Sequence, residues 1–301
     1  MKIYYGISGS LIDVTSICID KLMTNNIITI PYGGANRVAY FTDPLPGIHK
    51  KIFIVNNDEY CEYDEYMKVV INLETNNITK PKNDVENIIS KLHSTLKLKY
   101  GIFEHELPEQ KMSISYLTGN EKVLEIGGNI GRNSLIIASR LNHSDFVSLE
   151  SSPSIAKQLI ENRDLNQFTF HVENSALSSR KLIQKGWETK PSETLEPGYE
   201  WINTITLPQL HEKYNIEFDT LILDCEGAFY YILMDTPEIL DNINLIIMEN
   251  DYHDITHKQY IDSVLKNNFY IDYVEQGGWE PCYNNFFEVW KRASKPEIIY
   301  L

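Results

Sequence analysis

Short apolar runs alternate with amphipathic stretches from about residue 120 to the end of the chain. The apolar runs predict strands at 122–126, 146–150, 168–172, 219–224, 244–249, 270–275 and 285–291. The stretches between them carry apolar residues at helical spacing and predict helices at 131–141, 153–162, 227–234 and 256–267. This alternation predicts a mostly parallel sheet that is covered by helices on both faces. Too few residues separate the last two strands for a crossover, so we expect an antiparallel hairpin at the sheet edge.

The first 75 residues follow a different pattern, in which short β-branched or aromatic runs are separated by turn-forming residues. We expect strands at 3–7, 27–30, 37–41, 51–55 and 68–73, and a helix at 12–23. The polar stretch 76–84 contains Pro81 and is typical of a linker. The sequence therefore predicts a small β-rich module at 1–75, a linker at 76–84 and a larger α/β domain at 85–301. For the module, scaffolding, homodimer formation and acceptor binding all remain open.

Residues 174–218 interrupt the alternation and predict a long irregular loop. Loops of this length that lack secondary structure often act as lids or binding loops. Trp187, Tyr199 and Trp201 lie in this loop. Their rings either stack on an acceptor ring or hold the loop against the core, and the sequence favours neither role.

Composition and charge narrow the classes of function. With 43% hydrophobic and 23% charged residues, the chain has an ordinary globular composition. No apolar run approaches the roughly 18 residues of a membrane span, and no signal-peptide core follows Met1, so we expect a cytoplasmic protein without a membrane partner. The four cysteines are scattered, which indicates neither a zinc site nor a disulfide framework. A net charge of −15 repels phosphate backbones and argues against nucleic acid as a partner.

A glycine-rich turn follows the first strand of the larger domain. Residues 123–132 read Val-Leu-Glu-Ile-Gly-Gly-Asn-Ile-Gly-Arg, which predicts a strand, a tight turn and a helix. Gly127 and Gly131 let the backbone approach a ligand, and Glu125 places a carboxylate at the strand exit. The dinucleotide pattern G-x-G-x-x-G is absent, which disfavours a nicotinamide-dependent oxidoreductase. The acid favours a ligand that bears an ammonium group or hydroxyls, such as S-adenosylmethionine.

A second acid strengthens the prediction of a nucleoside site. Glu150 ends the next strand, 23 residues after Gly127, and about 20 residues is the spacing at which such a carboxylate meets ribose hydroxyls. Gln110 lies in the segment before the glycine turn. This segment either folds over the amino-acid end of the cofactor, with Gln110 as a contact, or forms a plain helix cap, and the sequence favours the cap. The remaining predicted cofactor contacts lie beside the strand ends, at Asn129, Ser151, Asn174, Ser175, Ala176 and Asp224.

Further acids follow the fourth and fifth strands of this domain. The run Leu221-Ile222-Leu223 leads to Asp224 and Glu226, and the next apolar run ends in Glu249. His253 follows shortly afterwards. Because parallel strands present their carboxyl ends at one edge of a sheet, we expect these side chains at a common ligand-binding rim.

In this region the chain resembles the FkbM-type methyltransferases, which methylate hydroxyls of sugars and of cyclic secondary metabolites with S-adenosylmethionine. The resemblance spans about 117–290 and rests on Glu125-Ile126-Gly127-Gly128-Asn129-Ile130-Gly131, Glu150, Thr206-Leu207, Asp224-Cys225-Glu226-Gly227-Ala228 and Glu249. It implies a class I methyltransferase fold, with a Rossmann-like seven-stranded sheet. Phe229 departs from the pattern, because the family usually places another Glu there. Residues 1–75 are outside the resemblance.

The resemblance implies an S-adenosylmethionine-dependent O-methyltransferase that acts on a sugar hydroxyl, either free, nucleotide-linked or part of a glycan. A methyltransferase for a non-sugar metabolite and a catalytically silent binding protein remain as alternatives. A sugar hydroxyl is a very weak acid, so a base must accept its proton. We favour Glu226 as this base over Asp224, Glu249 and His253.

A divalent ion is the other means of acidifying the hydroxyl. Asp224 with Glu249 and Asn250 resembles the oxygen ligands that hold Mg²⁺ in catechol-type methyltransferases. The alternative is that these side chains orient the cofactor and the helix ends without a metal.

Overall fold

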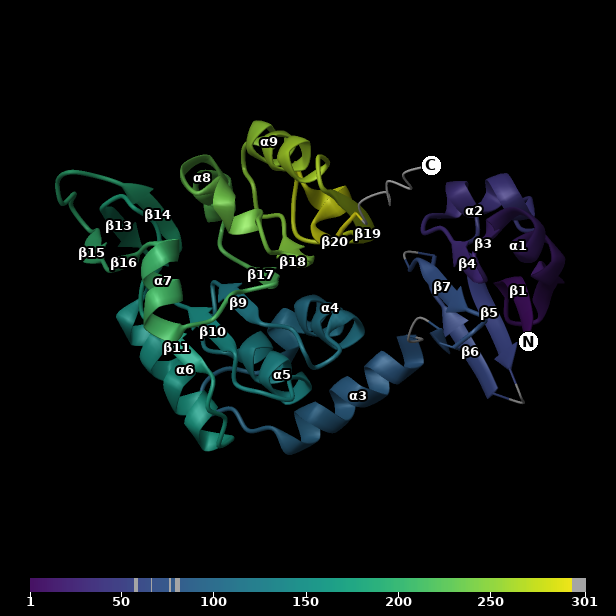
Figure 1. The fold of residues 1–301 in the computed structure, drawn as a ribbon, viewed down its shortest axis with the longest axis horizontal. Helices are drawn as coiled ribbons and strands as arrows, with labels where there is room; N and C mark the ends of the chain where they lie inside the picture. The colour runs from purple at the N-terminus through teal and green to yellow at the C-terminus, as the bar shows by residue number, and fades with distance from the viewer. Residues whose placement is uncertain (57–58, 66, 76, 79–81, 294–301) are drawn as a thin grey trace, which may run out of the picture. The chain divides into compact units, whose positions relative to one another are not determined.

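The computed structural model describes residues 1–56, 59–65, 67–75, 77–78 and 82–293. The chain divides into two compact units, Met1–Ser90 and Lys91–Leu301, each with its own hydrophobic core (Figure 1). Helix α3 (Lys82–Thr95) crosses this division. Of the predicted linker, residues 76 and 79–81 lie outside the described residues. No described helix is both long enough and apolar enough to cross a membrane.

The second unit is built on a seven-stranded sheet with the order β11-β10-β9-β17-β18-β20-β19. Its strands are β9 (Val123–Ile126), β10 (Phe146–Leu149), β11 (His171–Glu173), β17 (Thr220–Leu223), β18 (Leu245–Glu249), β19 (Phe269–Glu275) and β20 (Phe287–Arg292). The first five strands of this order are parallel, and β20 is antiparallel to both of its neighbours. The predicted α/β class with a Rossmann-like seven-stranded sheet is confirmed. The hairpin is also confirmed, with β20 inserted inside the sheet and β19 at its edge.

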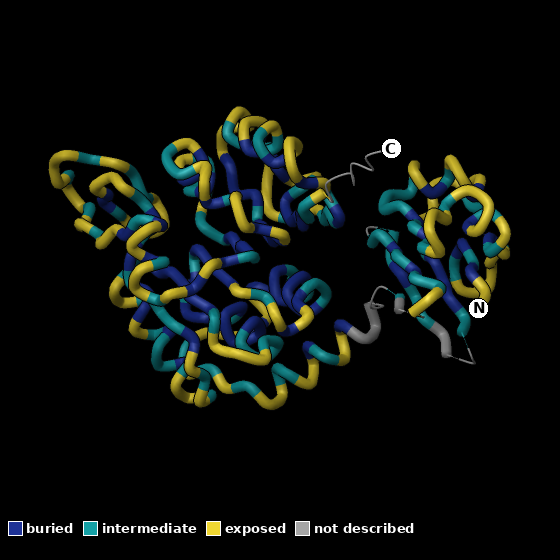
Figure 2. The backbone as a smooth tube through the Cα atoms, viewed as in Figure 1, coloured by how far each residue is buried: buried dark blue, intermediate teal, exposed yellow. Residues whose placement is uncertain are grey.

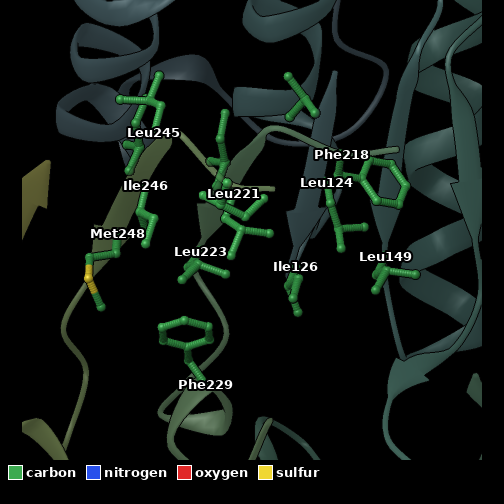
Figure 3. Close-up of a cluster of buried hydrophobic side chains, with 14 of the residues drawn as sticks. Leu124, Ile126, Leu149, Phe218, Leu221, Leu223, Phe229, Leu245, Ile246 and Met248 are labelled. Carbon is green, nitrogen blue, oxygen red and sulfur yellow. The ribbon is translucent and has the colours of Figure 1, made fainter. Parts of the chain in front are cut away.

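The apolar runs became strands because both faces of the sheet are covered. All residues of β9, β10 and β17 are buried (Figure 2), as expected for parallel strands between two helical layers. Figure 3 shows Leu221, Leu223 and Ile126 projecting into one such layer, with Phe229 of the following helix beside them. The helices of this unit are α4 (Leu107–Tyr116), α5 (Arg132–Arg140), α6 (Pro153–Leu165), α7 (Leu207–Tyr214), α8 (Ala228–Asp235) and α9 (Ile255–Leu265).

The prediction of an irregular loop at 174–218 is wrong, because the segment folds into short strands and a helix. A three-stranded sheet has the order β14-β13-β15, and β12 pairs with β16. These strands are β12 (Ala176–Leu177), β13 (Leu182–Lys185), β14 (Glu188–Pro191), β15 (Glu200–Ile202) and β16 (Thr204–Ile205). Gly186 adopts a φ of 59° in the tight turn between β13 and β14. Strands of two to four residues with many polar side chains carry too little hydrophobic alternation to be recognised.

The first unit contains two four-stranded antiparallel sheets, with the orders β2-β1-β5-β6 and β3-β4-β7-β8. Its strands are β1 (Lys2–Ile7), β2 (Ser10–Asp13), β3 (Met23–Thr24), β4 (Ile27–Ile30), β5 (Lys51–Asn56), β6 (Glu59–Tyr63), β7 (Val69–Asn72) and β8 (Asn77–Ile78). The predicted helix at 12–23 is shorter, at α1 (Thr15–Leu22). The predicted strand at 37–41 is wrong, because these residues belong to helix α2 (Gly34–Phe41). Arg37 and Phe41, four residues apart, are both buried on one face of this helix. The same spacing also lies on one face of a strand, so these two positions do not separate the two structures in the sequence.

Candidate functional site

An open cavity of about 1230 Å³ lies at the carboxyl ends of β9, β10 and β17. Residues of β13, β14 and α8 also line it. This volume includes space that is open to solvent. From the sequence-predicted set, the cavity is lined by Gly127, Asn129, Glu150, Ser151, Ser175, Ala176, Asp224 and Glu226.

The glycine turn lies directly against the exit of β17. Gly127 has a φ of 93°, and a Cβ atom at this position would lie 1.6 Å from the backbone oxygen of Asp224. No other residue type fits here without moving the backbone of one of the two strands. The backbone N–H of Gly127 donates to the carbonyl oxygen of Leu149 on the neighbouring strand, at 3.0 Å. The turn therefore brings the ends of three parallel strands together around the cavity.

Glu150 is held at the cavity wall by backbone groups. Its Oε2 accepts from the backbone N–H of Asn129 at 2.9 Å, and its Oε1 accepts from that of Ser152 at 2.8 Å. Burial raises the pKa of Glu150, while these N–H groups lower it. Each carboxylate oxygen has a second acceptor position, so Glu150 can still bind a pair of ligand hydroxyls.

Glu125 lies beneath the turn and outside the cavity wall. Its carboxylate accepts from the hydroxyls of Ser134 and Ser148, the latter at 2.6 Å. Burial raises its pKa to about 7. Glu125 therefore supports the turn from below rather than reaching the cavity.

The structure places three other predicted cofactor residues away from the cavity wall. Gln110 is fully buried, with its Oε1 2.7 Å from Nε2 of His93 and its amide donating to the carbonyl oxygen of Phe103. The amide of Asn174 donates to the carbonyl oxygen of Glu150 at 2.8 Å and so supports the end of β10. Gly131 forms the N-terminal cap of α5. Among the described residues, these three support the wall without lining it.

A smaller hollow shares Gly127 and Asp224 with the cavity, and five of its twelve lining residues are acids. One carboxylate oxygen from each of Glu109, Asp224 and Glu249 lies within 4.8 Å of the other two. Asp224 and Glu249 meet, as predicted, because β17 and β18 are parallel neighbours. Glu109 comes from α4, and the sequence analysis missed it. Its Oε2 is buried and has no hydrogen-bond partner among the described residues.

Burial and the closeness of the other carboxyl groups raise the pKa of all three acids. Burial raises the pKa of Glu109 to about 7. The pKa of Glu249 rises to about 10, through burial and then through its hydrogen bond with Glu109. Asp224 is half-buried, and its pKa lies well above its usual range, first through burial of its carboxyl group and then through repulsion by Glu249. Without a bound cation the cluster therefore retains protons at neutral pH.

Two predicted residues take other positions. Asn250 is fully buried, and its amide donates to the carbonyl oxygen of Asn285 at 2.7 Å, so it anchors the segment before β20. His253 is exposed, and its ring lies near that of Trp279 rather than on the cavity wall. Phe229, where the resembled family has a Glu, is fully buried beside Leu223 (Figure 3) and offers no group to an acceptor.

Glu226 lines the cavity in a left-handed backbone conformation, with a φ of 50°. Its side chain shares a hydrogen bond with that of Asp251. Burial and this contact raise the pKa of Glu226 to about 8. The sequence analysis missed Asp251, which lies two residues after the end of β18 and is 6% exposed.

The insertion at 174–218 contributes residues to the cavity wall. Trp187, which follows the turn after β13, lines the cavity and is 54% exposed. Arg180 also lines it and forms an ion pair with Asp235 of α8. Of the three aromatic residues that the sequence pointed to here, Tyr199 and Trp201 lie outside the cavity wall among the described residues.

No protein-family model matches the sequence, and no curated protein matches it. Among solved structures, a ribosomal protein L11 methylase from Lactobacillus delbrueckii subsp. bulgaricus is similar at 13% identity and a TM-score of 0.41, covering 65% of this chain and 82% of that one. An O-methyltransferase from Bacillus cereus in complex with SAH is similar at 14% identity and a TM-score of 0.40, covering 70% and 92%. At these values the likeness assigns no activity to this chain, and the FkbM resemblance stays a prediction.

Proposed function

We propose that the chain is an S-adenosylmethionine-dependent O-methyltransferase that acts on a sugar hydroxyl. The observation that carries this proposal is that two features line the same cavity. One is Glu150, which is held by two backbone N–H groups, and the other is the glycine turn, which packs against Asp224. A carboxylate beside a glycine turn, where a ligand can approach the backbone closely, suits a ligand that presents ribose hydroxyls and carries positive charge. The net charge of −15 disfavours a nucleic acid acceptor.

Different parts of the cavity wall serve different parts of the cofactor. Glu150 accepts from the ribose hydroxyls, and the segment from Ser175 to Leu177 packs against the base. The acidic end of β17 at Asp224 faces the positively charged portion. When bound, S-adenosylmethionine supplies an electrophilic methyl group.

Glu226 is the proposed base on the acceptor side. It lines the same cavity as Glu150, and its pKa of about 8 makes its carboxylate a stronger proton acceptor than an ordinary glutamate. Glu226 would accept the proton of the acceptor hydroxyl while the methyl group passes from sulfur to the hydroxyl oxygen, with S-adenosylhomocysteine as the leaving group. Much of the rate comes from holding the oxygen in line with the transferred methyl group.

The acid cluster also fits a divalent cation such as Mg²⁺. Glu109, Asp224 and Glu249 present oxygen ligands, which this ion prefers, and the unpartnered oxygen of Glu109 is available to it. This set differs from the sequence-predicted one, because Asn250 does not line the hollow that holds the three acids, whereas Glu109 does. A bound cation supplies positive charge that acidifies a nearby hydroxyl.

A methyl-transfer assay tests the proposed reaction. We expect transfer of a labelled methyl group from S-adenosylmethionine to members of a panel of sugar nucleotides and glycans. We also expect S-adenosylhomocysteine to raise the melting temperature, while NAD leaves it unchanged. A shift with NAD alone would contradict the cofactor assignment, and transfer only to non-sugar metabolites would contradict the sugar acceptor.

Replacing Glu150 with alanine is expected to weaken cofactor binding. The ribose hydroxyls lose a charged partner, a loss of about 1.5–3 kcal/mol, which corresponds to roughly a ten- to hundredfold rise in Kd. Calorimetric titration with S-adenosylhomocysteine measures it. Glu104→Ala, which removes an exposed acid outside the cavity wall, is the control. Equal affinity in both variants would remove Glu150 from the cofactor site.

A further inference from the structure

The loop between β19 and β20 returns to the carboxyl end of β18. The backbone N–H of Asn250 donates to the carbonyl oxygen of Phe286, and its side-chain amide donates to that of Asn285, both at 2.7 Å. The indole N–H of Trp279 donates to Oδ1 of Asp251 at 3.0 Å. The loop thereby places Trp279 beside Asp251, two residues after the end of β18.

The Trp279 ring is fixed in orientation but remains 48% exposed. Its edge packs against Phe286, with ring centroids 5.3 Å apart at 62°. The His253 ring lies nearly parallel to it, with centroids 6.5 Å apart at 17°. An aromatic ring that is held by a hydrogen bond and by ring contacts, and is still half exposed, is a preorganised stacking surface.

Asp251 connects this ring to the cavity. Its carboxyl group accepts from Trp279 and also shares a hydrogen bond with Glu226. Glu226 in turn lines the cavity. Gly227 brings the two loops close, because a Cβ atom there would lie 3.1 Å from the backbone oxygen of Asp251. Trp279, Asp251 and Glu226 therefore form one hydrogen-bonded series from the surface to the cavity wall.

We propose that Trp279, Asp251 and Glu226 form the acceptor subsite, and that this subsite takes a pyranose ring. The proposal rests on the proposed function, because it names where the acceptor of that reaction binds. A pyranose has a face of C–H groups, which packs on an aromatic ring, and a rim of hydroxyls, which require acceptors. Trp279 supplies the ring, and Glu226 accepts from the hydroxyl. Asp251 is a positioning residue, which holds the side chains of Trp279 and Glu226 in place relative to each other.

Three variants separate stacking from positioning. Trp279→Ala removes both the ring and the N–H donor, so we expect the acceptor KM to rise about tenfold, the size of effect given by one well-placed ring. Trp279→Phe keeps a ring and loses only the donor, so we expect KM to stay near the wild-type value and kcat to fall. Asp251→Asn is expected to lower kcat more than it changes KM. Trp201→Ala, which removes another exposed tryptophan outside the cavity wall, is the matched control.

Direct binding separates failure of this subsite from failure of the proposed function. Methyl α-D-glucopyranoside and methyl α-D-mannopyranoside are titrated into the full chain saturated with S-adenosylhomocysteine, and tryptophan fluorescence is followed. We expect quenching in the wild type and in Trp201→Ala, and none in Trp279→Ala. If S-adenosylhomocysteine binds but neither glycoside does, or if Trp279→Ala keeps the wild-type KM, the subsite is overturned while the cofactor assignment stands. If S-adenosylhomocysteine itself fails to bind, both the proposed function and the acceptor subsite are contradicted.

Discussion

Replacing Glu226 with glutamine is expected to lower kcat by a factor of about 10²–10⁴, the usual contribution of a positioned general base. The amide keeps the size of the side chain but cannot accept the hydroxyl proton. Because we assign Glu226 to the acceptor and Glu150 to the cofactor, the affinity for S-adenosylhomocysteine should not change. Single-turnover methyl transfer and calorimetry measure the two quantities separately.

A matched control is Glu238→Gln, which alters an exposed acid outside the cavity wall and should leave kcat unchanged. Undiminished turnover in Glu226→Gln would assign the proton to another acceptor. Asp224 would then be the next candidate, since it lines the same cavity.

The free energy of unfolding is expected to fall as pH rises from about 4.5 to about 7. Burial raises the pKa of Glu109 from 4.5 to about 7, so in this range the folded chain binds more protons than the unfolded chain. Stability then decreases with rising pH, and the contribution of Glu109, about 3 kcal/mol for a shift of this size, is fully lost above about pH 7. Glu125, buried and shifted in the same direction to about 7, contributes in the same range. Urea unfolding at a series of pH values measures the effect.

A divalent cation should reverse this loss at neutral and higher pH, because it replaces the protons that the cluster otherwise holds. Glu109→Gln has two opposite consequences. It should make the cation-free chain more stable at neutral pH, and it should abolish the rise in melting temperature that Mg²⁺ produces in the wild type. Glu104→Gln, an exposed acid, serves as control. A wild-type melting temperature that does not respond to Mg²⁺, Mn²⁺ or Ca²⁺ would exclude the cation and leave a protonated carboxyl cluster.

The elements that the sequence predicted well are those whose residues share one environment along their whole length. The β9, β10 and β17 strands are buried on both faces, so each reads as a mainly apolar run with a single polar residue, Glu125, Ser148 or Thr220. Elements with mixed surroundings were misread. Helix α2 has only a few turns and carries β-forming residues, and the strands inserted at 174–218 are short and largely polar. Local preferences are weak there and tertiary packing decides the structure.

The same distinction applies to the candidate site. The sequence by itself determined the fold class, the glycine turn and the nearness of Asp224 to Glu249, because adjacent parallel strands must present their carboxyl ends at one edge of the sheet. Only the tertiary structure decided that Glu109 of α4 completes the acid cluster, that Glu125 and Gln110 face inward, and that Trp279 reaches Asp251. These placements depend on how a helix and a loop pack against strands far away in the chain. A periodic pattern of apolar residues within one element does not predict such contacts.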